Sequence, residues 1–68
     1  MKIEYDEEAD AAYIYLKYPL KDGECKTTKE LNENVIFDYD KDGKLVGVEI
    51  LHASKVLTKK VIEEALAA

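Results

Sequence analysis

The stretch of sequence that decides the fold is Val35-Ile36-Phe37-Asp38-Tyr39-Asp40-Lys41-Asp42-Gly43-Lys44-Leu45-Val46-Gly47-Val48-Glu49-Ile50. Large apolar side chains alternate on both sides of Asp42-Gly43, a dipeptide that favours a tight turn between two antiparallel strands. A two-residue loop at this dipeptide sets apolar side chains opposite each other, pairing Tyr39 with Val46, Phe37 with Val48 and Val35 with Ile50. A three-residue loop with Gly43 as a bulge moves the pairing by one residue, unless further bulges restore the alternation. We therefore predict a central hairpin with the two-residue loop.

A second hairpin is predicted before the central one. Ile3 to Tyr5 and Ala12 to Leu16 alternate in the same way, and the acidic segment 6–10 separates them. Segment 18–23 contains a proline and an Asp-Gly pair, so it is expected to be a loop. Segment 24–31 has few large apolar residues and two lysines, which suits the edge of a sheet, where charge opposes further strand pairing.

The period of the pattern changes after Leu51. Apolar residues then recur at the spacing of one helical face, at Leu57, Val61, Ile62, Ala65 and Leu66, with Ser54 or Thr58 as the N-cap. We predict an α+β fold in a single domain over residues 1–68. A small antiparallel sheet of about five strands, a hairpin-rich meander over residues 2–51, carries one C-terminal α-helix over about 54–67, packed on one face.

The charge of the chain bears on its partners. Fifteen acidic residues against ten lysines, with no arginine, give a net charge of −5, which opposes direct binding to nucleic acid. The longest apolar run, residues 11–16, is too short to cross a membrane, and the N-terminus lacks a secretory signal, so a cytoplasmic location is expected. A basic protein, or a second copy of the chain in a homodimer, is the predicted partner.

Three motifs carry a resemblance to a known family. They are the opening Met1-Lys2-Ile3-Glu4-Tyr5-Asp6-Glu7-Glu8-Ala9-Asp10-Ala11, the hairpin Phe37-Asp38-Tyr39-Asp40-Lys41-Asp42-Gly43, and the close Val46-Gly47-Val48-Glu49-Ile50-Leu51-His52-Ala53-Ser54-Lys55. The chain resembles the family catalogued as domain of unknown function 2283 over nearly its whole length. It departs from the pattern in a long, proline-bearing segment 18–23 and in a longer tail after Lys55. The resemblance implies a small bacterial or archaeal cytosolic α+β protein with no established activity and no catalytic residues to carry over.

The acids of the central hairpin match a calcium-loop pattern. Asp38, Asp40, Asp42 and Glu49, with Gly43 between them, stand at the spacing of an EF-hand loop. An EF-hand loop needs a helix on each side, and both flanks here alternate as strands do. A calcium-binding module at residues 38–49 is therefore an alternative hypothesis, and solvated acids around a turn are the preferred interpretation.

No catalytic, metal-binding or cofactor-binding residue is predicted, and no cofactor. His52, Cys25 and Ser54 are residue types found in nucleophilic sites, but nothing in the sequence brings them together. An enzyme whose site is completed by a partner chain, with Cys25 and His52 meeting across the interface, is a further alternative. The acids Asp6, Glu7, Glu8 and Asp10 are expected to be a solvated turn.

Two tyrosines point to an interaction surface. Tyr13 and Tyr15 alternate with Ile14, so a helix that covers the Ile14 face leaves both tyrosines on the open face of the sheet. Tyrosine is favoured at protein interfaces, although cross-strand packing on a half-exposed sheet explains the pair equally well. The preferred hypothesis is a non-enzymatic interaction or regulatory domain, self-associating or antitoxin-like, that uses the tyrosine face or the edge strand.

Overall fold

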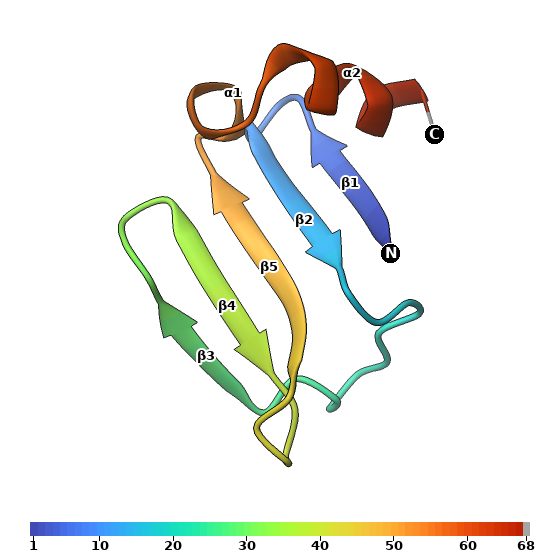
Figure 1. Cartoon of the computed structure of the whole chain (residues 1–68), viewed down its shortest axis with the longest axis vertical. Coiled ribbons are helices and arrows are strands. Elements are labelled where there is room, and N and C mark those ends of the chain that lie inside the picture. Colours follow the sequence, from blue (N-terminus) through green and yellow to red (C-terminus); the bar gives the residue numbers. More distant parts are fainter. Residues whose placement is uncertain (68) are drawn as a thin grey trace.

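A computed structural model describes residues 1–67 of the chain. Five strands form one antiparallel sheet, and two short helices follow them (Figure 1). The elements are β1 (Lys2–Asp6), β2 (Ala11–Tyr15), β3 (Thr27–Glu30), β4 (Val35–Tyr39), β5 (Leu45–Leu51), α1 (Ala53–Val56) and α2 (Lys59–Ala67). The predicted α+β class is confirmed. The predicted domain ends at residue 68, which lies outside the described residues.

The strand order is β1-β2-β5-β4-β3, and each neighbouring pair is antiparallel. A simple meander would place β3 beside β2, so the meander is interrupted at this one point. The reason is that β5 brings an apolar strand to β2, pairing Ala12 with Ile50 and Ile14 with Val48, whereas β3 is fully exposed and polar. The expectation of an edge strand in segment 24–31 is confirmed, because β3 is an outermost strand.

The loop of the β4–β5 hairpin differs from the prediction. The Gly43 amide donates to the Asp40 carbonyl at 3.0 Å, and the Asp40 amide donates to the Lys44 carbonyl at 2.8 Å, so the loop has three residues. Asp40 Oδ1 favours this longer loop by accepting from the amides of Asp42 and Lys44, both at 2.9 Å. Gly43 supplies the left-handed residue that ends such a loop, with φ of 78°. The prediction of a two-residue loop was therefore wrong.

A bulge in β5 restores the predicted core pairing. Phe37 faces Val48 and Val35 faces Ile50, as expected, but Tyr39 faces Leu45 because Val46 is the extra residue. The shift made by the longer loop is thus cancelled before the hairpin reaches the centre of the sheet.

The C-terminal helix is divided into two. Leu57 is extended, with φ of −99° and ψ of 150°, and it separates α1 from α2. Thr58 Oγ1 accepts from the Val61 amide at 3.3 Å, so Thr58 and not Ser54 caps the longer helix. The prediction of one continuous helix over 54–67 was wrong, because Leu57 leaves the helical path to pack against the buried core.

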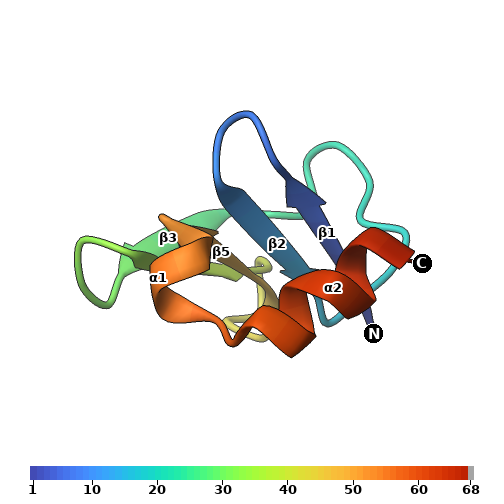
Figure 2. The ribbon, with the colours of Figure 1, turned by 90° about the horizontal axis from the view of Figure 1, so that it is seen from above.

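Both helices lie on one side of the sheet, as predicted, and cover only part of it. Figure 2 shows α1 and α2 on one side and the β1–β2 turn projecting on the other. α2 contacts β1 and α1 contacts the end of β5. The molecule is flat, with principal extents of 34, 25 and 17 Å. Within residues 1–67, the buried apolar residues are few, and two of them are alanines: Ala12, Val46, Ile50 and Ala53.

None of the helices in residues 1–67 has the length and apolar character needed to cross a membrane.

Candidate functional site

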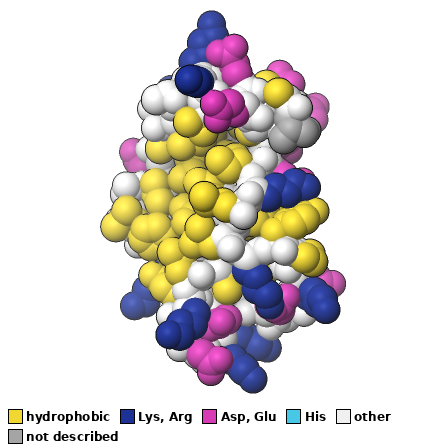
Figure 3. Space-filling model, turned by 45° about the vertical axis from the view of Figure 1, so that its right-hand side comes forward, with side chains coloured by type: hydrophobic (Ala, Val, Ile, Leu, Met, Phe, Trp, Pro, Cys, Tyr) yellow, Lys and Arg dark blue, Asp and Glu magenta, His cyan; other side chains and the backbone are white. Residues whose placement is uncertain are grey.

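The side of the sheet that carries the helices presents an apolar surface. Strand pairing places Ile14, Val35, Phe37, Tyr39, Leu45 and Val48 together on this side, and we call this set the apolar face. All six side chains are half-buried or exposed, and Leu45 is 40% exposed. In Figure 3, which views the molecule obliquely from this side, apolar side chains form a broad patch between two charged ends. The helices therefore leave much of this face uncovered.

The total accessible surface of the protein is large for a chain of this size. The accessible surface is 4964 Å², whereas a compact monomer of the same mass exposes about 4,300 Å². The excess of about 600 Å² per chain approaches the roughly 800 Å² that each partner contributes to a standard protein interface. The excess accessible surface of the chain is thus close to the area that one protein buries in a standard interface.

The opposite side of the sheet, which we call the open face, carries the two predicted tyrosines. Tyr13 and Tyr15 lie on it, as expected from their alternation with Ile14. Their rings meet edge to face with centroids 4.7 Å apart, and Tyr15 meets Tyr18 in the same way at 5.2 Å. The three rings form a continuous aromatic row across β2 and the loop that follows it.

Tyr13 is fixed by the strand beside it. Its ring lies over Gly47, where a Cβ atom would stand only 2.1 Å from the tyrosine hydroxyl oxygen. The hydroxyl donates to Asp38 Oδ2 at 2.6 Å. Partial burial, and then this hydrogen bond to a carboxylate, raise the pKa of Tyr13 far above its ordinary value of 10.0. Tyr13 is therefore a neutral, oriented donor at neutral pH.

Two of the four calcium-loop acids, Asp38 and Asp40, accept hydrogen bonds from within the protein. Asp38 accepts from Tyr13 and, through Oδ1, from the Thr28 hydroxyl at 3.0 Å, while Asp40 closes its own hairpin loop. The segment is a β-hairpin, so the two helices of an EF-hand are not there to aim Glu49 at an ion. Within residues 1–67, no three His, Cys, Asp or Glu side chains are grouped so as to hold a metal ion.

Cys25 and His52 lie at opposite ends of the β4 strand. Cys25 Sγ is 3.8 Å from the Thr28 hydroxyl, beside the end of β4 at Tyr39. His52 Nδ1 is 2.9 Å from Asn34 Oδ1, beside the start of β4. The fold of one chain therefore does not bring these two residues together.

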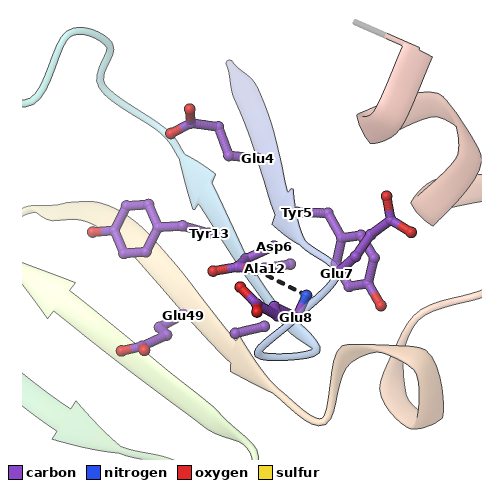
Figure 4. Close-up of a pocket in the computed structure, with 9 residues that line it drawn as sticks. Glu4, Tyr5, Asp6, Glu7, Glu8, Ala12, Tyr13 and Glu49 are labelled. Atoms are coloured by element: carbon purple, nitrogen blue, oxygen red, sulfur yellow. Dashed lines mark hydrogen bonds between the residues drawn. The ribbon is translucent and has the colours of Figure 1, made fainter.

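The acidic turn between β1 and β2 is held by its own first residue. Asp6 Oδ1 accepts from the backbone amide of Glu8 at 3.0 Å (Figure 4). It also accepts from the backbone amide of Ala9 at 3.3 Å. This is the usual way in which an aspartate stabilises a tight turn. Asp6, Glu7 and Glu8 are exposed, as the sequence led us to expect. The same expectation was wrong for Asp10, which is half-buried because its carboxylate accepts hydrogen bonds from Tyr5 and Ser54.

Asp10 joins the first and last of the three sequence motifs. Its Oδ1 accepts from the Tyr5 hydroxyl at 2.7 Å and the Ser54 amide at 3.0 Å, and its Oδ2 accepts from the Ser54 hydroxyl at 2.7 Å. Its backbone carbonyl accepts from the Ala53 amide at 2.8 Å. Hydrogen bonds from Ser54 and Tyr5 lower the pKa of Asp10 below its usual 3.8, so the carboxylate is charged at neutral pH. This junction ties α1 to the β1–β2 turn.

Sequence reasoning missed Gly47 and the Asp10–Ser54 junction. A glycine inside a strand is a known sign of close approach by another group, and Gly47 gave that sign. Asp10 and Ser54 stand 44 positions apart, and no periodic pattern connects them. The only sequence feature that marked both Asp10 and Ser54 is that each lies in one of the family motifs.

The comparisons with known proteins agree with these motifs. The model of the family described as "Protein of unknown function (DUF2283)" matches residues 2–54, which include all five strands and the Asp10–Ser54 junction. The chain is similar to "Uncharacterized protein MJ0789" of Methanocaldococcus jannaschii, with 40% identity over 57 residues. The aligned region is 82% of this chain and 44% of that protein, so the chain spans less than half the length of this relative. No solved structure matches. Because the family model covers most of the chain and both ends of its hydrogen-bonded junction, the chain belongs to the DUF2283 family.

Proposed function

We propose that this chain is a non-enzymatic protein-interaction domain that forms a homodimer through its apolar face. The observation that carries the proposal is the small buried core. Within residues 1–67, four apolar residues are buried and two of them are alanines, whereas Phe37, Val48 and Tyr39 remain half-exposed on one side of a flat sheet. Burial of apolar area is the main favourable term in association as well as in folding. A second surface that covers this face therefore favours association and also stabilises the folded chain.

A second copy of the chain is the occupant that fits this face. Two sheets pack face to face at about 10 Å, and a two-fold axis brings one apolar face against an identical one. The excess surface of about 600 Å² per chain supports a dimer of ordinary interface size. The edge strand β3 supports it less well, because its exposed residues include Lys29 and Glu30, and such charges oppose strand-to-strand pairing.

Light scattering on adjacent variants of one strand tests the proposal. Phe37 and Ile36 are neighbours on β4 whose side chains lie on opposite faces of the sheet, so lysine at each position gives a matched pair. We expect the wild type and Ile36→Lys to scatter as dimers of the 7.7 kDa chain at high micromolar concentration, and Phe37→Lys to scatter as a monomer. Phe37 lies outside the group of residues packed against the core cluster, so the substitution spares that cluster.

A second variant controls for the possibility that Phe37→Lys dissociates the dimer by unfolding the chain. Leu45 is 40% exposed on the same face, so Leu45→Lys costs little stability in a monomer and should also dissociate the dimer. A wild-type chain that stays monomeric at these concentrations contradicts the proposal. So does a dimer that survives Leu45→Lys and Phe37→Lys but dissociates in Ile36→Lys.

The cellular setting forms part of the same proposal. A single cysteine, which forms no disulfide within the chain, is typical of the reducing cytoplasm, and we place the domain there. A regulatory role of the antitoxin type, in which an acidic chain holds a basic protein, is supported by the net charge of −5.

A further inference from the structure

The open face has an ordered arrangement of acids and tyrosines. Strand pairing puts Glu4, Tyr13 and Glu49 side by side on β1, β2 and β5. One step along the strands, on the same face, it puts Lys2, Tyr15 and Gly47 side by side. Each row runs across the strands, and the two rows are about 6.7 Å apart, which is two residues of extended chain.

A hollow lies between Glu4 and Glu49 because of the way Tyr13 leans. The ring of Tyr13 tilts onto Gly47 in the neighbouring row to reach Asp38, and this leaves its own row open. The space has a volume of about 910 Å³ and opens to solvent (Figure 4). Two intervals between strands separate Glu4 from Glu49, so their backbones stand about 10 Å apart, enough to admit one side chain of a partner.

The hollow is negatively charged and has no cation of its own. Its lining includes five carboxylates, those of Glu4, Asp6, Glu7, Glu8 and Glu49. Within residues 1–67, the ion pair formed is Lys17 with Glu24, so none of these five belongs to one. Like charges held close together repel one another, and a cation placed among them relieves that repulsion.

The aromatic row formed by Tyr13, Tyr15 and Tyr18 already contacts one ammonium group of the chain. Lys2 Nζ lies 4.4 Å from the centroid of the Tyr18 ring and 3.1 Å from its hydroxyl oxygen. A cation over an aromatic face is attracted by the negative charge of the π system. The chain's own lysine therefore shows how this end of the open face accepts a cation, and the Tyr15 ring stands beside it.

We propose that the open face binds an extended, lysine- or arginine-bearing segment of a partner protein. One basic side chain enters the hollow between Glu4 and Glu49, and a second, two residues further along, reaches the Tyr15 ring. The spacing of the two rows matches the spacing of side chains on one side of an extended segment. This site is on the side of the sheet opposite the apolar face, so it goes beyond the proposed self-association and does not depend on it.

A peptide titration followed by amide chemical shifts tests the inference. The probe is a capped heptapeptide that alternates threonine and lysine, and the control peptide has each lysine acetylated, which keeps its length and removes its charge. We expect saturable shifts at Glu4, Tyr13, Tyr15 and Glu49 with the lysine peptide and none with the acetylated one. The Phe37→Lys variant should bind the peptide as the wild type does, which separates this site from the dimer.

Matched variants locate the binding energy. Glu49→Gln and Glu33→Gln remove one negative charge each, the first from the hollow and the second from the exposed β3–β4 turn. We expect Glu49→Gln and Tyr15→Leu each to weaken binding about two- to fivefold, as the loss of one cation contact does, and Glu33→Gln to leave it unchanged. Equal weakening by Glu49→Gln and Glu33→Gln, or shifts centred away from β1, β2 and β5, would overturn the inference, because binding would then follow net charge alone.

Discussion

Gly47 and Tyr13 act as one unit at the centre of the open face. The missing side chain of Gly47 is the space that the Tyr13 ring occupies, and the ring in that place reaches Asp38. Asp38 is in turn held by Thr28, so the contact runs from β2 across β5 and β4 to β3. A residue with no side chain thus allows hydrogen bonding across four strands.

Substitution of Gly47 should reveal this coupling. Gly47→Ala pushes the flexible end of the Tyr13 ring away from Asp38 and should destabilise the protein by about 1 kcal/mol. In a Tyr13→Ala background the same change meets no ring, and alanine should stabilise the strand by about 0.5 kcal/mol relative to glycine. Urea unfolding of the four proteins in this cycle measures the difference. Equal effects of Gly47→Ala in both backgrounds would show that the two residues are independent.

Asp10 should make folding sensitive to acid. Its folded pKa is below the usual 3.8, because Ser54 and Tyr5 donate hydrogen bonds to the charged carboxylate. Stability from this group is therefore fully present above pH 3.8 and is lost as the pH falls through the lower folded pKa. We expect Asp10→Asn to be less stable than the wild type at neutral pH and to lose less stability on acidification. Urea unfolding between pH 2 and 7 measures both curves, and parallel curves would rule out the assigned role.

At the scale of elements, the strands were predictable and the breaks between elements were not. Alternation identified β1, β2, β4 and β5, because apolar and polar side chains take opposite faces of these strands. β3 is exposed along its whole length, and it was predicted instead from its lysines and its lack of large apolar residues. The bulge at Val46 and the break at Leu57 depend on contacts far away in sequence: Val46 is displaced by the three-residue loop, and Leu57 turns inward to the core. The Asp10–Ser54 link is long-range in the same way. Local patterns carry no information about such contacts.

The second helix depends on its cap. α2 has nine residues and no acidic residue in its first turn, where Lys59 and Lys60 oppose the helix dipole. Thr58→Ala removes the hydroxyl that accepts from the Val61 amide and should cost about 1 kcal/mol. Thr58→Ser keeps the acceptor and should cost much less. Helical circular dichroism together with thermal unfolding measures both variants, and equal losses would show that the hydroxyl does not cap α2.

At the scale of the whole molecule, the two sides of the sheet have different surfaces. The side with the helices is apolar and under-covered, and the other side carries tyrosines and acids. The sequence indicated the tyrosine side correctly but not the uncovered apolar side, because the length of a helix does not tell how much of a sheet it covers. That depends on where α1 and α2 dock, at one end of β5 and over β1.

The central claim is that the apolar face meets a second copy of itself. Isotope-filtered NMR on a mixture of labelled and unlabelled chains tests it most directly, because signals between labelled and unlabelled protons arise only across an interface. We predict contacts between chains from the Phe37 ring to the methyl groups of Val35, Val48 and Leu45, all on the apolar face. Contacts between chains that instead start from Tyr13 and Tyr15, or none at all at high micromolar concentration, would contradict the account.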